Sequence, residues 1–195
     1  MRTAEVERNT NETKIRIVLN LDGRGDSELD TGIGFMDHML ALFSKHGRFD
    51  LKAVCKGDTE VDFHHSTEDL GIALGTAFKQ ALGDKKGIVR YGNMMLPMDE
   101  ALILSAVDLS GRCCLNYRID IPSEKVGDFD TELVSEFFMG FARASESTIH
   151  LIEIDGSNSH HIIEAAFKSV ARSLKQAVAF EPGFEEDTPS TKGVL

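Results

Sequence analysis

Apolar side chains recur along the first half of the chain with two periods, one typical of strands and one of helices. Residues 13–22 and 49–57 alternate between apolar and charged positions, which predicts strands that bury one face. Residues 34–47 and 61–83 space their apolar side chains three and four positions apart, which predicts amphipathic helices. A glycine at the end of each helical run indicates its C-terminus.

The second half repeats this order of periods. Residues 101–111, 113–122 and 149–156 have the pattern of strands, and residues 130–147 and 160–178 have the pattern of helices. Each helix has one apolar stripe that must be covered by a sheet or by another helix. We therefore predict an α+β fold in which each half is a roughly four-stranded sheet backed by two helices.

A repeated motif indicates that the two halves arose by internal duplication. The string HHSTED begins at His64 and the string HHIIEA begins at His160, each at the start of the last predicted helix of its half. In both strings a glutamate follows the first histidine by four positions. We therefore divide the chain into a first repeat (1–92), a second repeat (93–182) and a tail (183–195).

Composition and charge argue against several classes of protein. Apolar residues make up 42% and charged residues 27% of the chain, as in globular proteins. The formal net charge of -11 argues against general binding to nucleic acid or to anionic membranes. No apolar run reaches the roughly 18 residues that span a bilayer, and the first residues lack the apolar core of a secretory signal. We therefore expect a cytoplasmic protein that binds neither nucleic acid nor membrane.

The two motifs place histidine and carboxylate groups where they could bind metal ions. Positions four apart share a helix face, so His64 can point with Glu68, and His160 can point with Glu164. The second histidine of each doublet is turned by about 100° and must point elsewhere. Two such helices could serve two metal ions. Imidazole nitrogen together with carboxylate oxygen suits Mn, Fe, Co, Ni or Zn.

Two further histidines extend the metal hypothesis. If His38 and His150 join the doublets, each metal could have three histidines and one glutamate. Such a set leaves coordination positions free for a substrate, as in catalytic sites. Spacing alone leaves the roles of His38 and His150 open. An isolated histidine such as His46 is more simply an ordinary hydrogen-bonded residue.

Cations near predicted turns suggest a site for an anion. Arg90 and Arg112 stand at strand ends or in loops, and Ser190 and Lys192 belong to the turn sequence STKG in the tail. Hydroxyl, ammonium and backbone N–H groups in such a turn can bind phosphate. In an acidic chain these residues are candidate anchors for an anionic substrate, and the tail is a candidate phosphate-binding segment.

Five segments in order, spread over essentially the whole chain, resemble those of the imidazoleglycerol-phosphate dehydratase family: RNTNETKI, GIGFMDHML, DFHHSTEDLGIALG, SNSHHIIEAAFKSVARSLKQA and PSTKGVL. The resemblance implies a hydro-lyase of L-histidine biosynthesis. Its reaction would remove water from D-erythro-imidazole glycerol phosphate and give imidazole acetol phosphate. The resemblance also implies two Mn2+ ions per active site and a 24-subunit shell built from trimers, in which neighbouring chains complete the sites.

The resemblance further implies roles for particular residues. The implied metal ligands are His38, His64, His65, Glu68, His150, His160, His161 and Glu164. The implied phosphate ligands are Arg90, Arg112, Ser190 and Lys192. Glu12 is implied to approach the substrate, and the carboxylate that transfers a proton is either Glu12 or Glu164. Which histidine of each doublet serves which metal stays open. Leu42 is a departure, because many relatives carry there a glutamine that contacts the substrate.

Three other functions would use the same metal ligands. A metal-buffering protein would need no phosphate-binding turn and would not convert imidazole glycerol phosphate. A structural protein would use metal to join chains, and its assembly would survive the removal of every catalytic carboxylate. A metallohydrolase would release phosphate from imidazole glycerol phosphate without dehydrating it.

Overall fold

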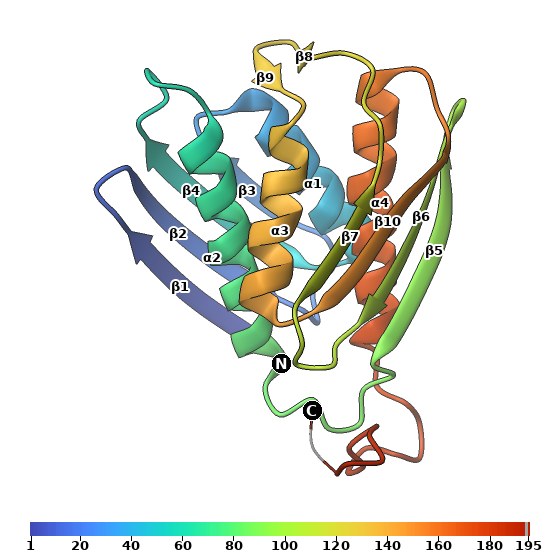
Figure 1. Cartoon of the computed structure of the whole chain (residues 1–195). Coiled ribbons are helices and arrows are strands. Elements are labelled where there is room, and N and C mark those ends of the chain that lie inside the picture. Colours follow the sequence, from blue (N-terminus) through green and yellow to red (C-terminus); the bar gives the residue numbers. More distant parts are fainter. Residues whose placement is uncertain (194) are drawn as a thin grey trace.

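Two four-stranded sheets enclose a layer of four helices in the computed structural model, which describes residues 1–193 and residue 195 (Figure 1). Each sheet buries one face against the helices. Along β2 (Thr13–Asn20), Ile15 and Ile17 point inward and are almost fully buried, whereas Arg16 between them points to solvent. Burial of such side chains between the layers is the main favourable contribution to folding. Within the described residues, no helix is both long enough and apolar enough to cross a membrane.

The elements follow one another in the same order in both halves. Those of the first half are β1 (Thr3–Asn9), β2, β3 (Ser27–Asp30), α1 (Gly34–Gly47), β4 (Asp50–Gly57) and α2 (His64–Leu82). Those of the second half are β5 (Tyr91–Met98), β6 (Ala101–Asp108), β7 (Cys114–Arg118), β8 (Lys125–Val126), β9 (Phe129–Asp130), α3 (Leu133–Ser145), β10 (Thr148–Asp155) and α4 (Ser159–Ala177).

The two sheets have the same topology. The strand order is β1-β2-β4-β3 in the first sheet and β5-β6-β10-β7 in the second. In each sheet the first two strand pairs are antiparallel and the last pair is parallel. This match confirms the predicted α+β fold with internal duplication. The second sheet begins at Tyr91, close to the predicted limit between the repeats.

Three strands that the sequence pattern did not reveal all lie at sheet edges. Strand β1 has only Val6 fully buried, and the four residues of β3 are mostly polar and exposed. Strand β5 contains Gly92 and Pro97. Proline is tolerated there because one edge of β5 has no hydrogen-bonded neighbour in the sheet. An edge strand is less buried than a central one, so its apolar alternation is weak.

Two predicted helices begin later than expected. Residues 61–63 form a turn before α2, and residues 130–132 lead from the β8–β9 hairpin into α3. This hairpin occurs only in the second half and lies at the end of the molecule where the helices begin (Figure 1). Its Phe129 is buried and packs against Phe35 of α1, with ring centroids 5.1 Å apart.

The helices pack in pairs across the two halves, α1 with α4 and α2 with α3. Glycines allow close approach in the second pair. A Cβ atom on Gly71 would lie 2.3 Å from the carbonyl oxygen of Phe137, so only glycine fits there. All four helices begin at the same end of the molecule (Figure 1). Side chains in their first turns are therefore gathered at that end.

Candidate functional site

Five of the seven histidines occupy the first two turns of helices: His38, His64, His65, His160 and His161. A side chain just before each doublet helix accepts a backbone N–H group of its first turn. Asp62 accepts the backbone N–H of His64 at 2.7 Å, and Asn158 accepts that of His161 at 3.2 Å. The histidines are therefore held at the end of the molecule where the helices begin (Figure 1).

One group of donors converges within the described residues. The ligand atoms of His38, His160 and Glu164 all lie within 4.8 Å of one another. The Oε2 atom of Glu164 is 3.3 Å from Nε2 of His38 and 3.2 Å from Nε2 of His160. The contact within α4 is the one that the spacing of four predicts, whereas His38 arrives from α1 by tertiary packing. Two imidazole nitrogens and one carboxylate oxygen suit a transition metal.

Lys168 holds the other oxygen of Glu164. Its ammonium lies one helical turn further along α4 and hydrogen-bonds to Oε1 of Glu164. Burial of Glu164 disfavours its charged form, but the contacts with Lys168, His38 and His160 outweigh this and keep the pKa of Glu164 below its ordinary value. Glu164 is therefore ionised at neutral pH, as a metal ligand must be. Sequence reasoning missed Lys168, although its position four residues after Glu164 was an available signal.

The second histidine of each doublet meets a carboxylate through Nδ1. This atom lies 2.9 Å from Oδ2 of Asp58 in His65, and 2.7 Å from Oε2 of Glu100 in His161. These hydrogen bonds raise the pKa of both rings, and the contact with His161 lowers the pKa of Glu100 to about 2. Sequence reasoning missed Asp58 and Glu100, because both lie in turns without a motif.

The duplication gives His38 a counterpart in the second half. Helices α1 and α3 both end at a residue in the left-handed conformation, Arg48 with φ of 57° and Glu146 with φ of 52°. In both halves the next strand begins two residues later. His38 and Glu136 precede these caps by the same number of residues. Glu136 therefore occupies in α3 the place of His38 in α1, which sequence reasoning also missed.

Packing directs Glu136 toward the first doublet helix. Gly140 lies one turn after Glu136 on the same helix face. A Cβ atom on Gly140 would be 2.8 Å from the carbonyl oxygen of Glu68. The face of α3 that carries Glu136 thus meets the first turns of α2, where His64 and Glu68 lie. This arrangement repeats the contact of α1 with α4.

His150 lies apart from both groups within one chain. Its neighbours Ile149 and Leu151 are buried against the helices, so His150 points to the outer face of the second sheet. There it stands between Ala106 of β6 and Asn116 of β7. The described chain does not bring it to the group of His38, His160 and Glu164.

The residues implied to bind phosphate gather at the opposite end of the helix layer. The backbone N–H of Arg90 donates to the carbonyl of Ala177, the last residue of α4. The guanidinium of Arg90 donates to Asp108 and, at 2.7 Å, to the carbonyl of Pro189. The exposed Arg112 approaches the same Asp108 at 3.9 Å.

The described part of the tail forms a tight turn next to Arg90. The backbone N–H of Lys192 donates to the hydroxyl of Ser190 at 3.2 Å, and that of Gly193 donates to the carbonyl of Ser190 at 3.0 Å. Residue 194 of the predicted tail lies outside the described residues. The cations predicted as phosphate ligands therefore share one region with the STKG turn.

Two residues were expected near the substrate, and they differ in character. Glu12 lies in the turn between β1 and β2 with its side chain half exposed, and its Oε1 is 3.8 Å from Nε2 of His65. Leu42, one turn after His38 on α1, packs partly buried against the core. Leu42 therefore offers no polar contact at this position.

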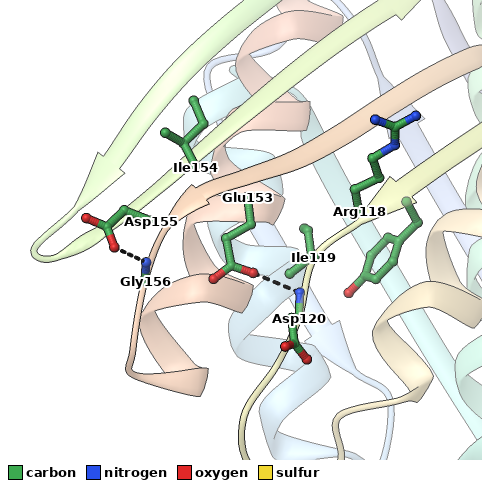
Figure 2. Close-up of a pocket in the computed structure, with 8 residues that line it drawn as sticks. Arg118, Ile119, Asp120, Glu153, Ile154, Asp155 and Gly156 are labelled. Atoms are coloured by element: carbon green, nitrogen blue, oxygen red, sulfur yellow. Dashed lines mark hydrogen bonds between the residues drawn. The ribbon is translucent and has the colours of Figure 1, made fainter.

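Two hollows differ in their relation to the histidines. One, of about 430 Å³, is lined by His38, Phe35, Phe63 and the β8–β9 hairpin, and its size suits a small ligand. The other, of about 530 Å³, lies at the ends of β7 and β10 and has no histidine in its lining. Figure 2 shows that Glu153 there accepts the backbone N–H of Asp120. We therefore assign the chemistry to the histidine end.

The comparisons with known sequences agree with one another. A family model described as "Imidazoleglycerol-phosphate dehydratase" matches residues 31–174. A relative of that name from Pelobacter propionicus is 54% identical over 194 residues, which is 100% of this chain and 99% of the relative. A relative of the same name from Synechococcus sp. (strain WH7803) is 51% identical over 195 residues, with coverage of 100% and 96%.

Solved structures show the same likeness. The crystal structure of imidazoleglycerol-phosphate dehydratase from Staphylococcus aureus has 40% identity and a TM-score of 0.84, covering 92% of this chain and 99% of that one. The crystal structure of IGPD from Pyrococcus furiosus in complex with (S)-C348 has 35% identity and a TM-score of 0.84, covering 97% of this chain and 100% of that one.

Proposed function

The chain belongs to the imidazoleglycerol-phosphate dehydratase family, hydro-lyases of histidine biosynthesis, and we propose that its dehydration reaction depends on bound Mn2+. One observation carries the proposal: the donor atoms of His38, His160 and Glu164 converge at the end of the molecule where the helices begin. The other histidines of the two doublets lie at the same end. Hard ions such as Mg2+ prefer sites made of oxygen alone, whereas two imidazole nitrogens favour a transition metal. The choice of Mn2+ among these metals rests on the family to which the chain belongs.

We place the second metal at the counterpart group. His64 and Glu68 would bind it together with Glu136, in the way that His160, Glu164 and His38 bind the first. His65 and His161 instead bond through Nδ1 to Asp58 and Glu100, which lie outside the two donor groups. Their Nε2 atoms would therefore complete metal sites on neighbouring chains. His150 could act as a ligand only in the same manner, because it faces outward.

We assign the general base to Glu12. Glu164 is 7% exposed and is held by His38, His160 and Lys168, so it is not free to reach a carbon atom of the substrate. Glu12 is half exposed on a turn and can take the carbon-bound proton as the hydroxyl leaves. When bound, the metal would act as a Lewis acid on the imidazole ring of the substrate and favour loss of the hydroxyl.

The positions of the two kinds of site favour an active site shared between chains. Arg90 is bonded to the last residue of α4, whereas His160 lies in the first turn of this 19-residue helix. At 1.5 Å per residue the helix is about 28 Å long. Imidazole glycerol phosphate is one small ring with a three-carbon phosphate chain, which is much shorter. If Arg90 binds the phosphate of the substrate, the metal that acts on its imidazole ring must therefore be bound by another chain.

The two sheets offer different outer faces for assembly. One row across the first sheet reads Glu5, Val18, Lys52 and Glu28. The corresponding part of the second sheet has Met95 beside Leu104 and Ile152, and Met95 is 55% exposed. An exposed apolar patch of this kind is typical of protein interfaces. We propose that this face joins chains in the expected assembly of 24 subunits built from trimers.

The test of the proposed function is an assay of imidazole glycerol phosphate before and after chelation. We expect turnover with Mn2+, loss of turnover after chelation, and recovery when Mn2+ is restored. Unchanged turnover in a preparation shown by elemental analysis to be metal-free would contradict the proposal. Release of phosphate in place of imidazole acetol phosphate would favour a metallohydrolase. We also propose a cytoplasmic location, in keeping with amino-acid biosynthesis, which cell fractionation can check.

A further inference from the structure

The imidazole rings of His65 and His161 each have one carboxylate near Nδ1 and another near Nε2. Nδ1 of His65 is 2.9 Å from Asp58, and Nδ1 of His161 is 2.7 Å from Glu100. On the opposite side, Nε2 of His65 is 3.8 Å from Glu12, and Nε2 of His161 is 3.8 Å from Asp99. A neutral histidine that donates its Nδ1–H to a carboxylate keeps its lone pair on Nε2.

The duplication of the chain does not account for this match. Asp58 follows β4, whereas Glu100 lies in the turn between β5 and β6. The counterpart of that turn in the first half is the β1–β2 turn, which carries Glu12. The two halves therefore reach the same contact from different places. Common descent explains the histidines, but a shared requirement on the rings explains the two carboxylates better.

Backbone N–H groups hold the Glu100 carboxylate directly, whereas for Asp58 it is the main chain that is fixed. Glu100 accepts the N–H of Asn158 at 2.7 Å and that of Ser157 at 3.3 Å, just before α4. The Asp58 side chain is 22% exposed, and its backbone N–H donates to the carbonyl of Glu12 at 3.1 Å. These are not mobile surface ion pairs, which order a side chain little.

We propose that Asp58 and Glu100 are positioning residues that fix the tautomer and direction of His65 and His161, so that Nε2 of each ring faces a metal ion. The proposal rests on the metal-dependent function proposed above. Histidines that bind metal usually donate their other N–H to a carboxylate or carbonyl, and loss of that partner weakens metal binding about 10–100-fold.

The same geometry explains why Glu12 is available for catalysis. In the second half, the carboxylate of the corresponding turn, Glu100, is used to hold His161 and the start of α4. In the first half Asp58 takes over that task, so Glu12 is left on the Nε2 side of His65. The β5–β6 turn thus supplies a carboxylate that positions a histidine, whereas the β1–β2 turn supplies one that is left for catalysis.

Titration of the metal-free full chain with Mn2+, followed by the electron paramagnetic resonance signal of free Mn2+, tests the proposal. We expect Asp58→Ala to weaken one class of sites roughly 10–100-fold. Asp58→Asn should weaken it less, because the amide oxygen still accepts the Nδ1–H. The visible spectrum of the Co2+-loaded protein should change in Asp58→Ala, since the orientation of one ligand is lost.

Glu60→Gln is the matched control, because it removes the same charge from the same loop at an exposed side chain. Its Mn2+ affinity should equal that of the wild type. Thermal unfolding of the metal-free variants shows whether they are folded, and Glu100→Ala provides a second test if Asp58→Ala is not. Equal affinity in wild type and in the folded alanine variants overturns the proposal, as does an equal loss in Glu60→Gln. A wild-type chain that binds no Mn2+ overturns the metal-dependent function instead.

Discussion

Glu12 and Glu164 show how the surroundings of a carboxylate decide its role. Glu164 is buried, and its two oxygens are divided between Lys168 on one side and two histidines on the other. Glu12 stands on a turn and is half exposed. A buried, fully engaged carboxylate is suited to holding a metal, whereas an exposed one next to the site is suited to moving a proton.

Glu12→Gln separates these two roles. We expect kcat to fall by about 10²–10⁴-fold while Mn2+ content stays at the wild-type level, because the amide cannot accept the proton. Glu164→Gln should lose metal and activity together. Glu7→Gln, an exposed change on the preceding strand β1, is the control. Wild-type kcat in Glu12→Gln would contradict its assignment as general base.

At this scale the sequence predicts contacts within one helix and misses those between segments. The spacing of His160 and Glu164 predicts their contact, because positions four apart share a helix face. The approach of Glu136 to α2, and of Asp58 to His65, depends on packing between segments, and no local pattern encodes it. Spacing left the role of His38 open and only a resemblance implied it, whereas the packing of α1 on α4 explains its position.

At the scale of elements, the central strands, the edge strand β7 and all four helices were predictable, and the other three edge strands were not. Strand β6 alternates strictly between buried and partly buried positions, so its period is visible in the sequence. Strands β1, β3 and β5 have only one paired neighbour in a sheet and less core to face. The helix pairs depend on glycines whose role becomes visible only when two backbones meet, as at Gly71.

Gly71→Ala tests the contact of α2 with α3. A Cβ atom there would lie 2.3 Å from a carbonyl oxygen of Phe137, so the two helices must move apart. We expect a loss of about 1–3 kcal/mol in the free energy of unfolding, measured by thermal unfolding of the metal-free chain. Gly34→Ala is the control, because its Cβ would meet nothing within 4 Å. Equal stability of both variants would contradict the close packing.

At the scale of the whole molecule, the chain separates its two kinds of site. Histidines lie where the helices begin, and the phosphate-binding candidates lie where α4 ends (Figure 1). A single chain cannot bring both to one small substrate. Sequence reasoning alone could not predict this separation, because it follows from the common direction of the four helices.

Met95→Glu tests the proposed assembly face. Burying the new charge in an apolar contact would be costly, so we expect the assembly to dissociate into smaller species in sedimentation velocity. Val54→Glu is the control on the charged outer face of the first sheet, where Val54 is 41% exposed. An intact assembly in Met95→Glu would exclude this face as an interface.

The most direct test of the shared, metal-dependent site is complementation between inactive variants. His160→Ala removes a proposed metal ligand at one end, and Arg112→Ala removes a proposed phosphate ligand at the other. Co-expressed in one assembly with Mn2+, the two variants should regain about a quarter of wild-type turnover, because chance pairing of chains leaves that share of two-chain sites intact. Co-expression of His160→Ala with His38→Ala should restore nothing, since both changes affect the same group. Activity of the first mixture no higher than that of its separate variants would contradict the shared site.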